Sequence, residues 1–228
     1  MEILPGIHWL QAGYANVYLC VEDAGLTLVD SGTPKQAGKI LNYVGGLGRA
    51  PEELRQICIT HADFDHAGSV AELQRLTGAT VYASSATAEY LRRGRAPQHL
   101  PRILRPITNF LNRYAAVAPQ ALVEVPAGTA LPVLGELHLL ATPGHTPEHH
   151  SFYSPSRGVL FAGDALGTRG GKLGLSPPFI TADVEAARRS ARWLLRLTHV
   201  LFACGHGEPL LSPGDASLAR FRSELEQH

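Results

Sequence analysis

The deciding stretch of this sequence reads Thr60-His61-Ala62-Asp63-Phe64-Asp65-His66-Ala67-Gly68. It begins where the apolar run Gln56–Thr60, which has the composition of a buried strand, comes to an end. A helical pattern starts soon after it, near Ser69. The segment between them, His61–His66, is therefore expected in a strand-to-helix loop, and α/β proteins build their sites in such loops.

Two imidazoles and two carboxylates stand in this loop, and zinc, iron and manganese accept both kinds of ligand. Alternation along an extended segment would point His61, Asp63 and Asp65 to one side, and the turn before the helix would swing His66 inward. The alternative interpretation is a helix N-terminus enriched in acids that favour the helix dipole. That alternative explains one aspartate, but not two with flanking histidines. The loop therefore predicts a metal site.

Three further apolar runs also lead to a residue that can bind a metal. Leu137–Ala141 leads to His145, Val159–Ala162 leads to Asp164, and Val200–Ala203 leads to His206. Histidine is also frequent, with 11 copies in the chain, and it is the commonest metal ligand among side chains. One histidine after a strand means little, whereas several strand ends that carry ligands predict one shared site.

The composition excludes several classes of protein. The chain has 228 residues, of which 45% are hydrophobic and 18% charged, so it can bury a core and is not disordered. Its 20 basic residues balance 20 acidic ones, which speaks against nucleic acid or an anionic membrane as partner. No signal peptide or membrane-spanning run is recognisable. The 3 scattered cysteines favour a reducing compartment, so a cytoplasmic location is expected.

Short apolar runs alternate with helical patterns, and a single domain over residues 1–228 is expected. Val17–Glu22 and Leu26–Val29 predict a hairpin, and Thr33–Val44 predicts a helix with a Thr-Pro start. Further helices are predicted for 69–76, 183–197 and from about 213 to near the C-terminus, and a further strand for 80–83. Hairpins mixed with strand–helix alternation indicate an α/β sandwich and not one parallel sheet.

The segment Thr87–Arg113 differs from the rest of the chain. It carries 6 arginines, 3 prolines and no acid after Glu89, and we expect a helical insertion at about 87–113. One interpretation is a solvated surface segment. The other is a lid whose arginines recognise an anionic substrate. Its aromatic residues lack the spacing of a nucleic-acid platform.

The sequence resembles the metallo-β-lactamase-fold hydrolase superfamily. The motifs that carry the resemblance occur in family order: Leu28-Val29-Asp30-Ser31-Gly32, the stretch 60–68, Thr142-Pro143-Gly144-His145-Thr146-Pro147, Gly163-Asp164 and Gly205-His206-Gly207. The resemblance implies an α/β (α+β) fold, a four-layer αββα sandwich with a metal site at one edge.

The resemblance also implies two divalent metal ions per chain. Carried over residue by residue, it gives His61 and His145 to the first metal, Asp65, His66 and His206 to the second, and Asp164 to both as a bridge. Asp65 would in addition accept a hydrogen bond from the nucleophile and orient it, which makes it the expected catalytic residue.

Asp63 departs from the family pattern, which has histidine at this position. A carboxylate can still bind a metal, so Asp63 stays in the expected ligand set. Three outcomes are open: Asp63 reaches the first metal directly, reaches it through a water molecule, or leaves the site weakened. The change bears on the identity of the metal. Zinc is favoured, and iron and manganese are the alternatives.

The function expected from this site is hydrolysis of an ester-like bond, a lactone, thioester or carboxylic ester, by a metal-bridging hydroxide. The expected partner is a small-molecule substrate, anionic under the lid interpretation; the sequence leaves the oligomeric state open. One alternative is an iron-dependent oxidoreductase of the same fold, similar to a persulfide dioxygenase, which Asp63 favours. The other is a metal-binding module without catalysis.

Several residues near these motifs have supporting roles to be tested. Asp30 is interpreted either as a turn aspartate or as a partner that orients a ligand histidine. His149 is expected to brace the site, and the resemblance implies a bracing role for Asn16. Cys204 is close to His206, but its apolar strand favours a buried structural thiol over a nucleophile.

Overall fold

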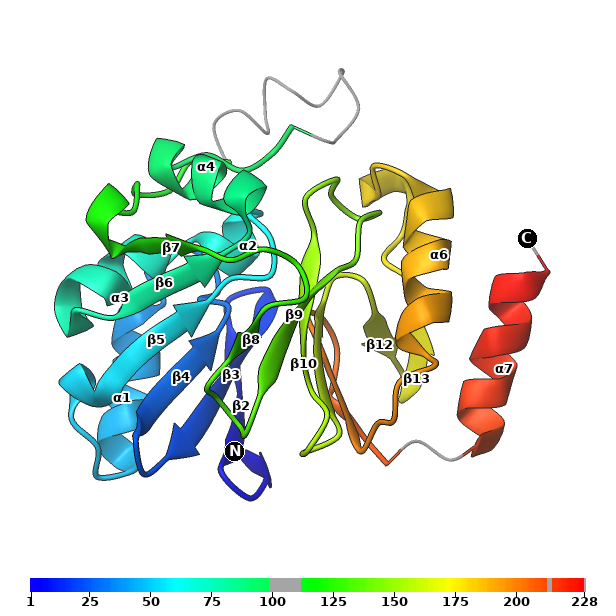
Figure 1. Cartoon of the computed structure of the whole chain (residues 1–228), viewed down its shortest axis with the longest axis horizontal. Helices are drawn as coiled ribbons and strands as arrows, with labels where there is room; N and C mark the ends of the chain where they lie inside the picture. Colours follow the sequence, from blue (N-terminus) through cyan, green and yellow to red (C-terminus); the bar gives the residue numbers. More distant parts are fainter. Residues whose placement is uncertain (99–111, 213–214, 228) are drawn as a thin grey trace. The chain divides into compact units, whose positions relative to one another are not determined.

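The computed structural model describes residues 1–98, 112–212 and 215–227. The chain divides into two compact units, Met1–Pro126 and Ala127–His228. Each unit has a main sheet of its own, and Figure 1 labels the strands and helices. Within the described residues, no helix combines the length and the apolar character that crossing a membrane requires.

The first unit is built on a seven-stranded sheet in which the strands follow one another in chain order. Its strands are β1 (Glu2–Leu4), β2 (Ile7–Ala12), β3 (Ala15–Glu22), β4 (Gly25–Val29), β5 (Leu54–Cys58), β6 (Thr80–Ala83) and β7 (Leu122–Glu124). Neighbours pair antiparallel from β1 to β4 and parallel from β4 to β7. The parallel strands therefore end at one edge of the sheet, where their loops meet.

Helices follow the parallel strands of this sheet: α1 (Ala37–Gly46), α2 (Phe64–Ala67), α3 (Val70–Thr77) and α4 (Ser85–Arg93), with 3-10 turns at Pro51–Glu53 and Pro119–Ala121. Ile40 of α1 and Leu73 of α3 join Ile57 of β5 in one buried cluster. Burying a side chain of this size contributes about 1.5–3 kcal/mol. The cluster thus fixes the loops that run between these strands and helices.

The predicted helix 33–44 was wrong at its start. Lys35 has a φ of 71°, a left-handed conformation that an α-helix does not contain, and α1 begins only at Ala37. The Ser69 hydroxyl stabilises the bend before α1 with two hydrogen bonds. It donates to the carbonyl of Thr33 at 2.6 Å and accepts from the backbone nitrogen of Gln36 at 2.8 Å.

Part of the predicted Arg-rich insertion lies in α4, which buries Thr87, Ala88 and Leu91. Arg92 on the same helix forms ion pairs with Glu124 and Glu89. Residues 99–111 of the segment lie outside the described residues, so the insertion and its two interpretations stay predictions.

The second unit contains a six-stranded sheet of order β15-β14-β11-β10-β9-β8 and a two-stranded ribbon. The sheet consists of β8 (Ala130–Leu131), β9 (Leu137–Ala141), β10 (His150–Ser154), β11 (Val159–Gly163), β14 (Leu201–Cys204) and β15 (Leu210–Leu211), and the ribbon of β12 (Gly167–Arg169) and β13 (Lys172–Gly174). β11 and β14 pair in parallel, while β9, β10 and β11 pair antiparallel.

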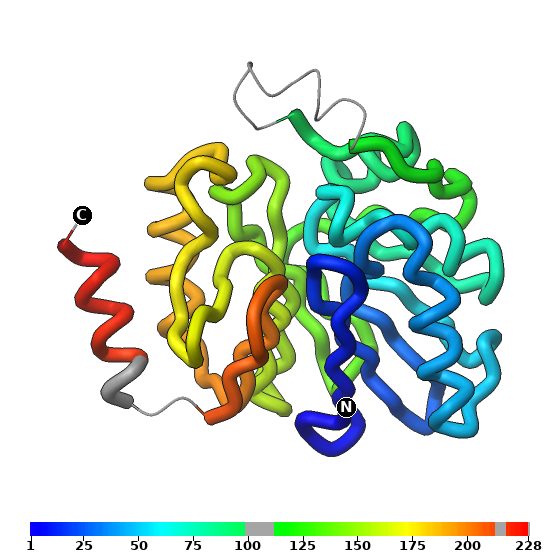
Figure 2. The backbone as a smooth tube through the Cα atoms, turned by 180° about the vertical axis from the view of Figure 1, so that it is seen from behind, coloured from blue at the N-terminus to red at the C-terminus, as the bar shows by residue number. Residues whose placement is uncertain are grey.

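Two helices, α6 (Val184–Leu194) and α7 (Asp215–Glu226), lie side by side in this unit, as Figures 1 and 2 both show, and a 3-10 turn spans Pro178–Ile180. Leu194 of α6 and Phe221 of α7 pack in one cluster with Phe202 of β14. The carboxylate of Asp183 caps α6 by accepting from the backbone nitrogen of Ala186 at 2.9 Å.

All three cysteines, Cys20, Cys58 and Cys204, are free and buried in strands. Burial raises the pKa of the Cys58 and Cys204 thiols well above their usual range. A thiol that stays protonated is a poor nucleophile. The prediction that Cys204 is buried in an apolar strand is confirmed.

Candidate metal centre

Asp30 organises the candidate ligands of the first unit. It directly follows β4, and its backbone nitrogen donates to the carbonyl of Cys58 at 2.8 Å, which extends the pairing of β4 with β5. Its φ of 61° turns the chain away from the sheet. The carboxylate is consequently buried, with the residue only 3% exposed.

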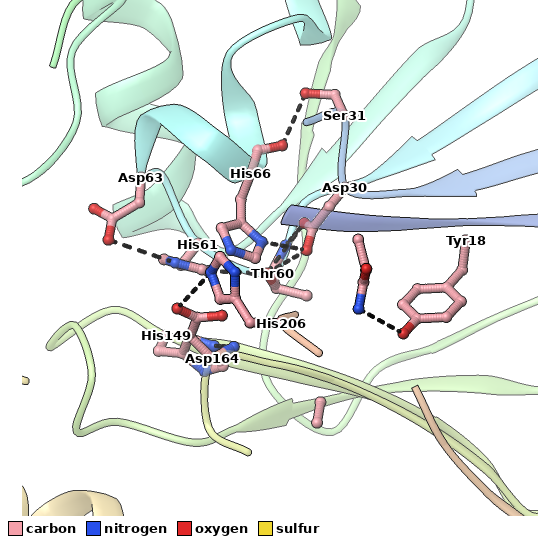
Figure 3. Close-up of polar contacts among 12 residues, drawn as sticks. Tyr18, Asp30, Ser31, Thr60, His61, Asp63, His66, His149, Asp164 and His206 are labelled. Carbon is pink, nitrogen blue, oxygen red and sulfur yellow. Dashed lines mark hydrogen bonds and ion pairs between the residues drawn. The ribbon is translucent and has the colours of Figure 1, made fainter. Parts of the chain in front are cut away.

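Two histidines are oriented by this one carboxylate (Figure 3). An Asp30 oxygen lies 2.8 Å from Nδ1 of His66. The hydroxyl of Thr60 lies 2.9 Å from an Asp30 oxygen and 3.0 Å from Nδ1 of His61. Asp30 therefore holds His66 directly and His61 through Thr60.

These contacts determine the tautomers of both rings. An ionised carboxylate only accepts, so Nδ1 of His66 carries its proton toward Asp30, and Thr60 donates its single hydroxyl hydrogen to Asp30. The Thr60 oxygen then accepts from Nδ1 of His61. Both rings, which lie 4.2 Å apart between centroids, have Nε2 as the nitrogen with the lone pair that a metal requires.

Asp63 occupies the position before α2, but its side chain does not cap that helix. One carboxylate oxygen lies instead 3.6 Å from Nε2 of His61 (Figure 3), and the side chain is 13% exposed. The alternative interpretation was an acid that stabilises the N-terminus of a helix. The side chain of Asp63 makes no capping hydrogen bond, so this residue does not support that alternative. Asp65 lies in the first turn of α2 and is half-buried.

The short helix α2 is held in place by the loop after β4. The backbone nitrogen and the hydroxyl of Ser31 both donate to the carbonyl of His66, at 2.7 and 2.8 Å. The nitrogen of Gly68 donates to the carbonyl of Gly32 at 3.0 Å. A Cβ at Gly68 would lie 2.4 Å from the ring of Pro34, so only glycine permits this approach.

Asp164 has the corresponding central place in the second unit. Its Oδ2 lies 3.3 Å from Nε2 of His145 and 3.4 Å from Nε2 of His206. The three residues follow β9, β11 and β14, as the sequence predicts for ligands at strand ends. His145 and Asp164 are buried, whereas the side chain of His206 is 38% exposed.

His149 braces Asp164, as predicted. The backbone nitrogen of Asp164 donates to Nε2 of His149 at 2.9 Å, so the proton of this neutral ring lies on Nδ1. Nδ1 donates to the hydroxyl of Thr142 at 2.9 Å. The chain continues from Thr142 to the Ser151 hydroxyl at 2.9 Å, and from Ser151 to the carbonyl of Ala162 at 2.9 Å.

The start of α6 and the segment before it hold the loop that carries His145. Nitrogens of Ala182 and Asp183 donate to the carbonyls of His145 and Gly144, both at 3.0 Å. The φ of Gly144 is 149°, and a Cβ there would lie 2.3 Å from the backbone of Ala187. Gly144 therefore allows a contact between loop and helix that no other residue permits.

Three hydroxyls, those of Thr60, Thr142 and Ser151, take part in these networks and were not singled out by sequence reasoning. Thr60 and Thr142 each lie at the end of a predicted strand, next to a ligand motif, which is the signal that could have found them. The amide oxygen of Asn16 accepts from the indole nitrogen of Trp9 at 2.8 Å, and the bracing role implied for Asn16 stays a prediction.

Comparison with known proteins identifies the family. A family model described as the metallo-beta-lactamase superfamily matches residues 10–206. The chain belongs to this superfamily. The expected metallo-β-lactamase fold is confirmed, because solved members of the superfamily share it. A family protein from Thermus thermophilus is 25% identical with a TM-score of 0.74, over 100% of this chain and 80% of that one.

Further proteins are similar to the chain over most of its length. "Probable metallo-hydrolase YflN" of Bacillus subtilis is 29% identical over 99% of this chain and 90% of its own length. A hydroxyacylglutathione hydrolase of Cereibacter sphaeroides is 30% identical over 91% of this chain and 69% of its own length. A B3 metallo-beta-lactamase described as the first with an active site glutamic acid has a TM-score of 0.75 at 24% identity, over 99% of this chain and 86% of that one.

Proposed function

We propose that this protein is a dinuclear metal-dependent hydrolase that cleaves an ester-like bond in a small molecule. The observation that carries the proposal is the Asp30 network, in which one buried carboxylate orients two histidines through Nδ1. A carboxylate on the far nitrogen of a histidine is the usual second partner of a metal-binding imidazole. Membership of the superfamily and relatives named as hydrolases support the same function.

The proposed ligands are assigned by sequence motif. His61, Asp63 and His145 would hold one metal ion, and Asp65, His66 and His206 would hold the other. Asp164 would serve both. The support is the order of the motifs within the superfamily match and the geometry inside each unit, where oxygen and nitrogen donors already face one another within 3.3 to 3.6 Å.

The donor set fits divalent metals with imidazole and carboxylate preferences, zinc above all, and also manganese and iron. Bound there, the metal ions would supply Lewis acidity to a water molecule and to the bond under attack. Asp65 would hold a proton of that water and orient it. Asp30 and His149 would keep the ligands in place through the contacts described above.

A thioester is the leading substrate class within this proposal, because hydroxyacylglutathione hydrolases are among the relatives. Lactones and carboxylic esters follow, since the same attack on a carbonyl cleaves them. The proposed setting is the reducing cytoplasm, which the three free cysteines support.

Metal analysis coupled to a hydrolase panel tests the proposal. Purified protein is expected to hold two zinc ions per chain and to cleave thioesters, lactones or esters, with activity lost on chelation and restored by zinc. Absence of turnover in protein that holds metal would leave a metal-binding module. A second candidate, an iron-dependent oxidoreductase, rests on the Asp63 carboxylate beside His61; iron in place of zinc together with oxygen consumption would favour it.

The assignment of ligands has its own test. His66→Ala and His206→Ala are expected to empty the same metal site and to leave the other site occupied. Loss of different metals in the two variants would contradict the proposed set. His138→Ala, which changes a histidine whose ring pairs with the exposed residue Glu136, is the control and should keep both metals.

A further inference from the structure

A cavity of about 490 Å³ lies within the second unit. The ribbon β12–β13 and the segment after it line the cavity, and His206 lines it as well. Ser176, another lining residue, donates its hydroxyl to the carbonyl of Asp164 at 2.8 Å. The volume is in the range of small-molecule sites, and the lining includes a proposed metal ligand.

The lining of the cavity is amphipathic. Leu173, Leu175 and Ile180 supply apolar surface, and Leu173 belongs to the buried cluster of this unit. Arg169 and Lys172 supply two exposed cations. None of the described residues that line the cavity is acidic.

Arg169 and Lys172 are directly opposite each other in the ribbon, on either side of the turn Gly170–Gly171. Like charges at opposite positions of two antiparallel strands destabilise their pairing. Neither cation has an ion pair within the described ranges 1–98, 112–212 and 215–227. The ribbon thus holds two uncompensated positive charges side by side, an arrangement that an anion would stabilise.

We propose that this cavity binds the acyl part of the substrate, and that the acyl part is an aliphatic chain ending in a carboxylate. The inference rests on the proposed hydrolase function and adds the substrate class to it. The chain would lie against Leu173, Leu175 and Ile180, its carboxylate would bind Arg169 and Lys172, and its scissile carbonyl would lie toward His206.

Two thioesters of N-acetylcysteamine that differ in one group form the test. The glutaryl thioester ends in a carboxylate, and the pentanoyl thioester carries a methyl group in its place. Thiol release is followed with a chromogenic disulfide. The wild type is expected to show a kcat/KM at least about tenfold higher for the glutaryl compound, since hydrogen bonds to charged groups are stronger than those between neutral groups.

The double variant Arg169→Gln/Lys172→Gln removes both cations of the cavity and tests their role directly. It is expected to lower kcat/KM for the glutaryl thioester about tenfold or more through KM, and to leave the pentanoyl value within about twofold. Removal of like charges from the ribbon relieves repulsion, so misfolding is not the expected cause. Arg189→Gln with Arg196→Gln, two exposed arginines outside the cavity, should change neither value. Equal changes for both thioesters, or none for either, would overturn the proposal.

Binding separates this proposal from the hydrolase function. Saturation-transfer NMR with hexanoate as the probe is expected to give a signal with wild type and with the Arg189/Arg196 variant, and none with the Arg169/Lys172 variant. A wild type that cleaves no thioester but binds hexanoate in this pattern refutes hydrolysis and keeps the anion site. Binding that is unchanged in the Arg169/Lys172 variant refutes the anion site, whether or not hydrolysis occurs.

Discussion

The candidate ligands of the two units are held by different chemistry. In the first unit a buried carboxylate, Asp30, fixes His66 directly and His61 through one hydroxyl. In the second unit a neutral histidine, His149, fixes Asp164 through its backbone nitrogen, and a chain of hydroxyls ends at a backbone carbonyl. The first arrangement places negative charge behind the ligands, and the second supplies geometry alone.

The two arrangements are expected to affect different properties, metal affinity in the first unit and loop stability in the second. A carboxylate on Nδ1 makes an imidazole a more basic ligand, so Asp30 would act on metal affinity in the proposed site. A hydrogen bond to a backbone nitrogen leaves the Asp164 carboxylate chemically unchanged, so His149 acts on the stability of the loop. Substitutions behind the two sets of ligands should therefore separate affinity from stability.

Asp30→Asn has the largest expected effect. Asparagine tolerates the positive φ of this position, but an amide nitrogen that faces His66 cannot accept from Nδ1 and shifts the ring proton to Nε2. Affinity for zinc in a chelator competition should fall up to about 100-fold. Asp23→Asn in the exposed turn after β3 is the control. Affinity retained within about twofold would remove Asp30 from its role.

His149→Ala comes next and should act on stability. The buried backbone nitrogen of Asp164 would lose its acceptor, which costs about 1–3 kcal/mol in the free energy of unfolding measured with urea. His149→Gln should recover part of the loss, since an amide oxygen can accept from the same nitrogen. A larger effect on zinc affinity than that of Asp30→Asn would reverse the comparison between the units.

Asp63→Ala sharpens the comparison inside the first unit. Because the side chain faces His61 and caps no helix, its loss should lower metal content or turnover about tenfold, while the free energy of unfolding changes by less than about 0.5 kcal/mol. Asp183→Ala is the matched control, because that aspartate does cap a helix and should cost about 1 kcal/mol without loss of metal. The opposite pattern would make Asp63 a capping residue.

Ser151→Ala has the smallest expected effect. It removes the hydroxyl between Thr142 and Ala162, and the expected cost is about 1 kcal/mol of unfolding free energy. Zinc affinity should change less than about threefold, since no ligand loses a direct contact. Ser223→Ala on the exposed face of α7 should be silent in both measurements.

The contrast between the units also explains how far the sequence predicts the site. The candidate ligands of the first unit are nearly contiguous in the chain, so residue types and spacing were enough to single them out. The candidate ligands of the second unit lie on three separate loops, and they were singled out by the apolar runs before them and by the family motifs. Strand ends were predictable because the runs 137–141 and 80–83 coincide with β9 and β6.

Contacts made through hydroxyls and through unusual backbone angles were not predictable. Threonine and serine are ordinary residues in or beside strands, so residue type alone does not mark Thr60, Thr142 and Ser151. Their role depends on hydrogen-bond partners that are distant in the chain. Lys35 adopts a left-handed φ that nothing in its side chain favours. A pattern of helical residues continues through such a position, which is why the predicted helix 33–44 began too early.

Sequence reasoning left two interpretations for the arginines of the segment 87–113, a solvated surface segment and a lid that recognises an anionic substrate. Of these arginines, Arg92 and Arg93 form ion pairs with Glu89 on their own helix. The ribbon residues Arg169 and Lys172, by contrast, are separated by two glycines and paired across strands. The number of basic residues is higher in the segment 87–113 than in the ribbon. The proposed binding of an anion depends instead on which basic side chains have no acidic partner among the described residues.

The three buried cysteines can be used to measure local unfolding of the protein by alkylation. Cys20 and Cys58 lie in the sheet of the first unit and Cys204 in that of the second, all shielded from thiol reagents in the folded chain. Alkylation can then proceed only when a sheet opens, and its rate measures that opening. Mass spectrometry of the alkylated peptides would show, without any introduced label, which unit opens first when a chelator is added.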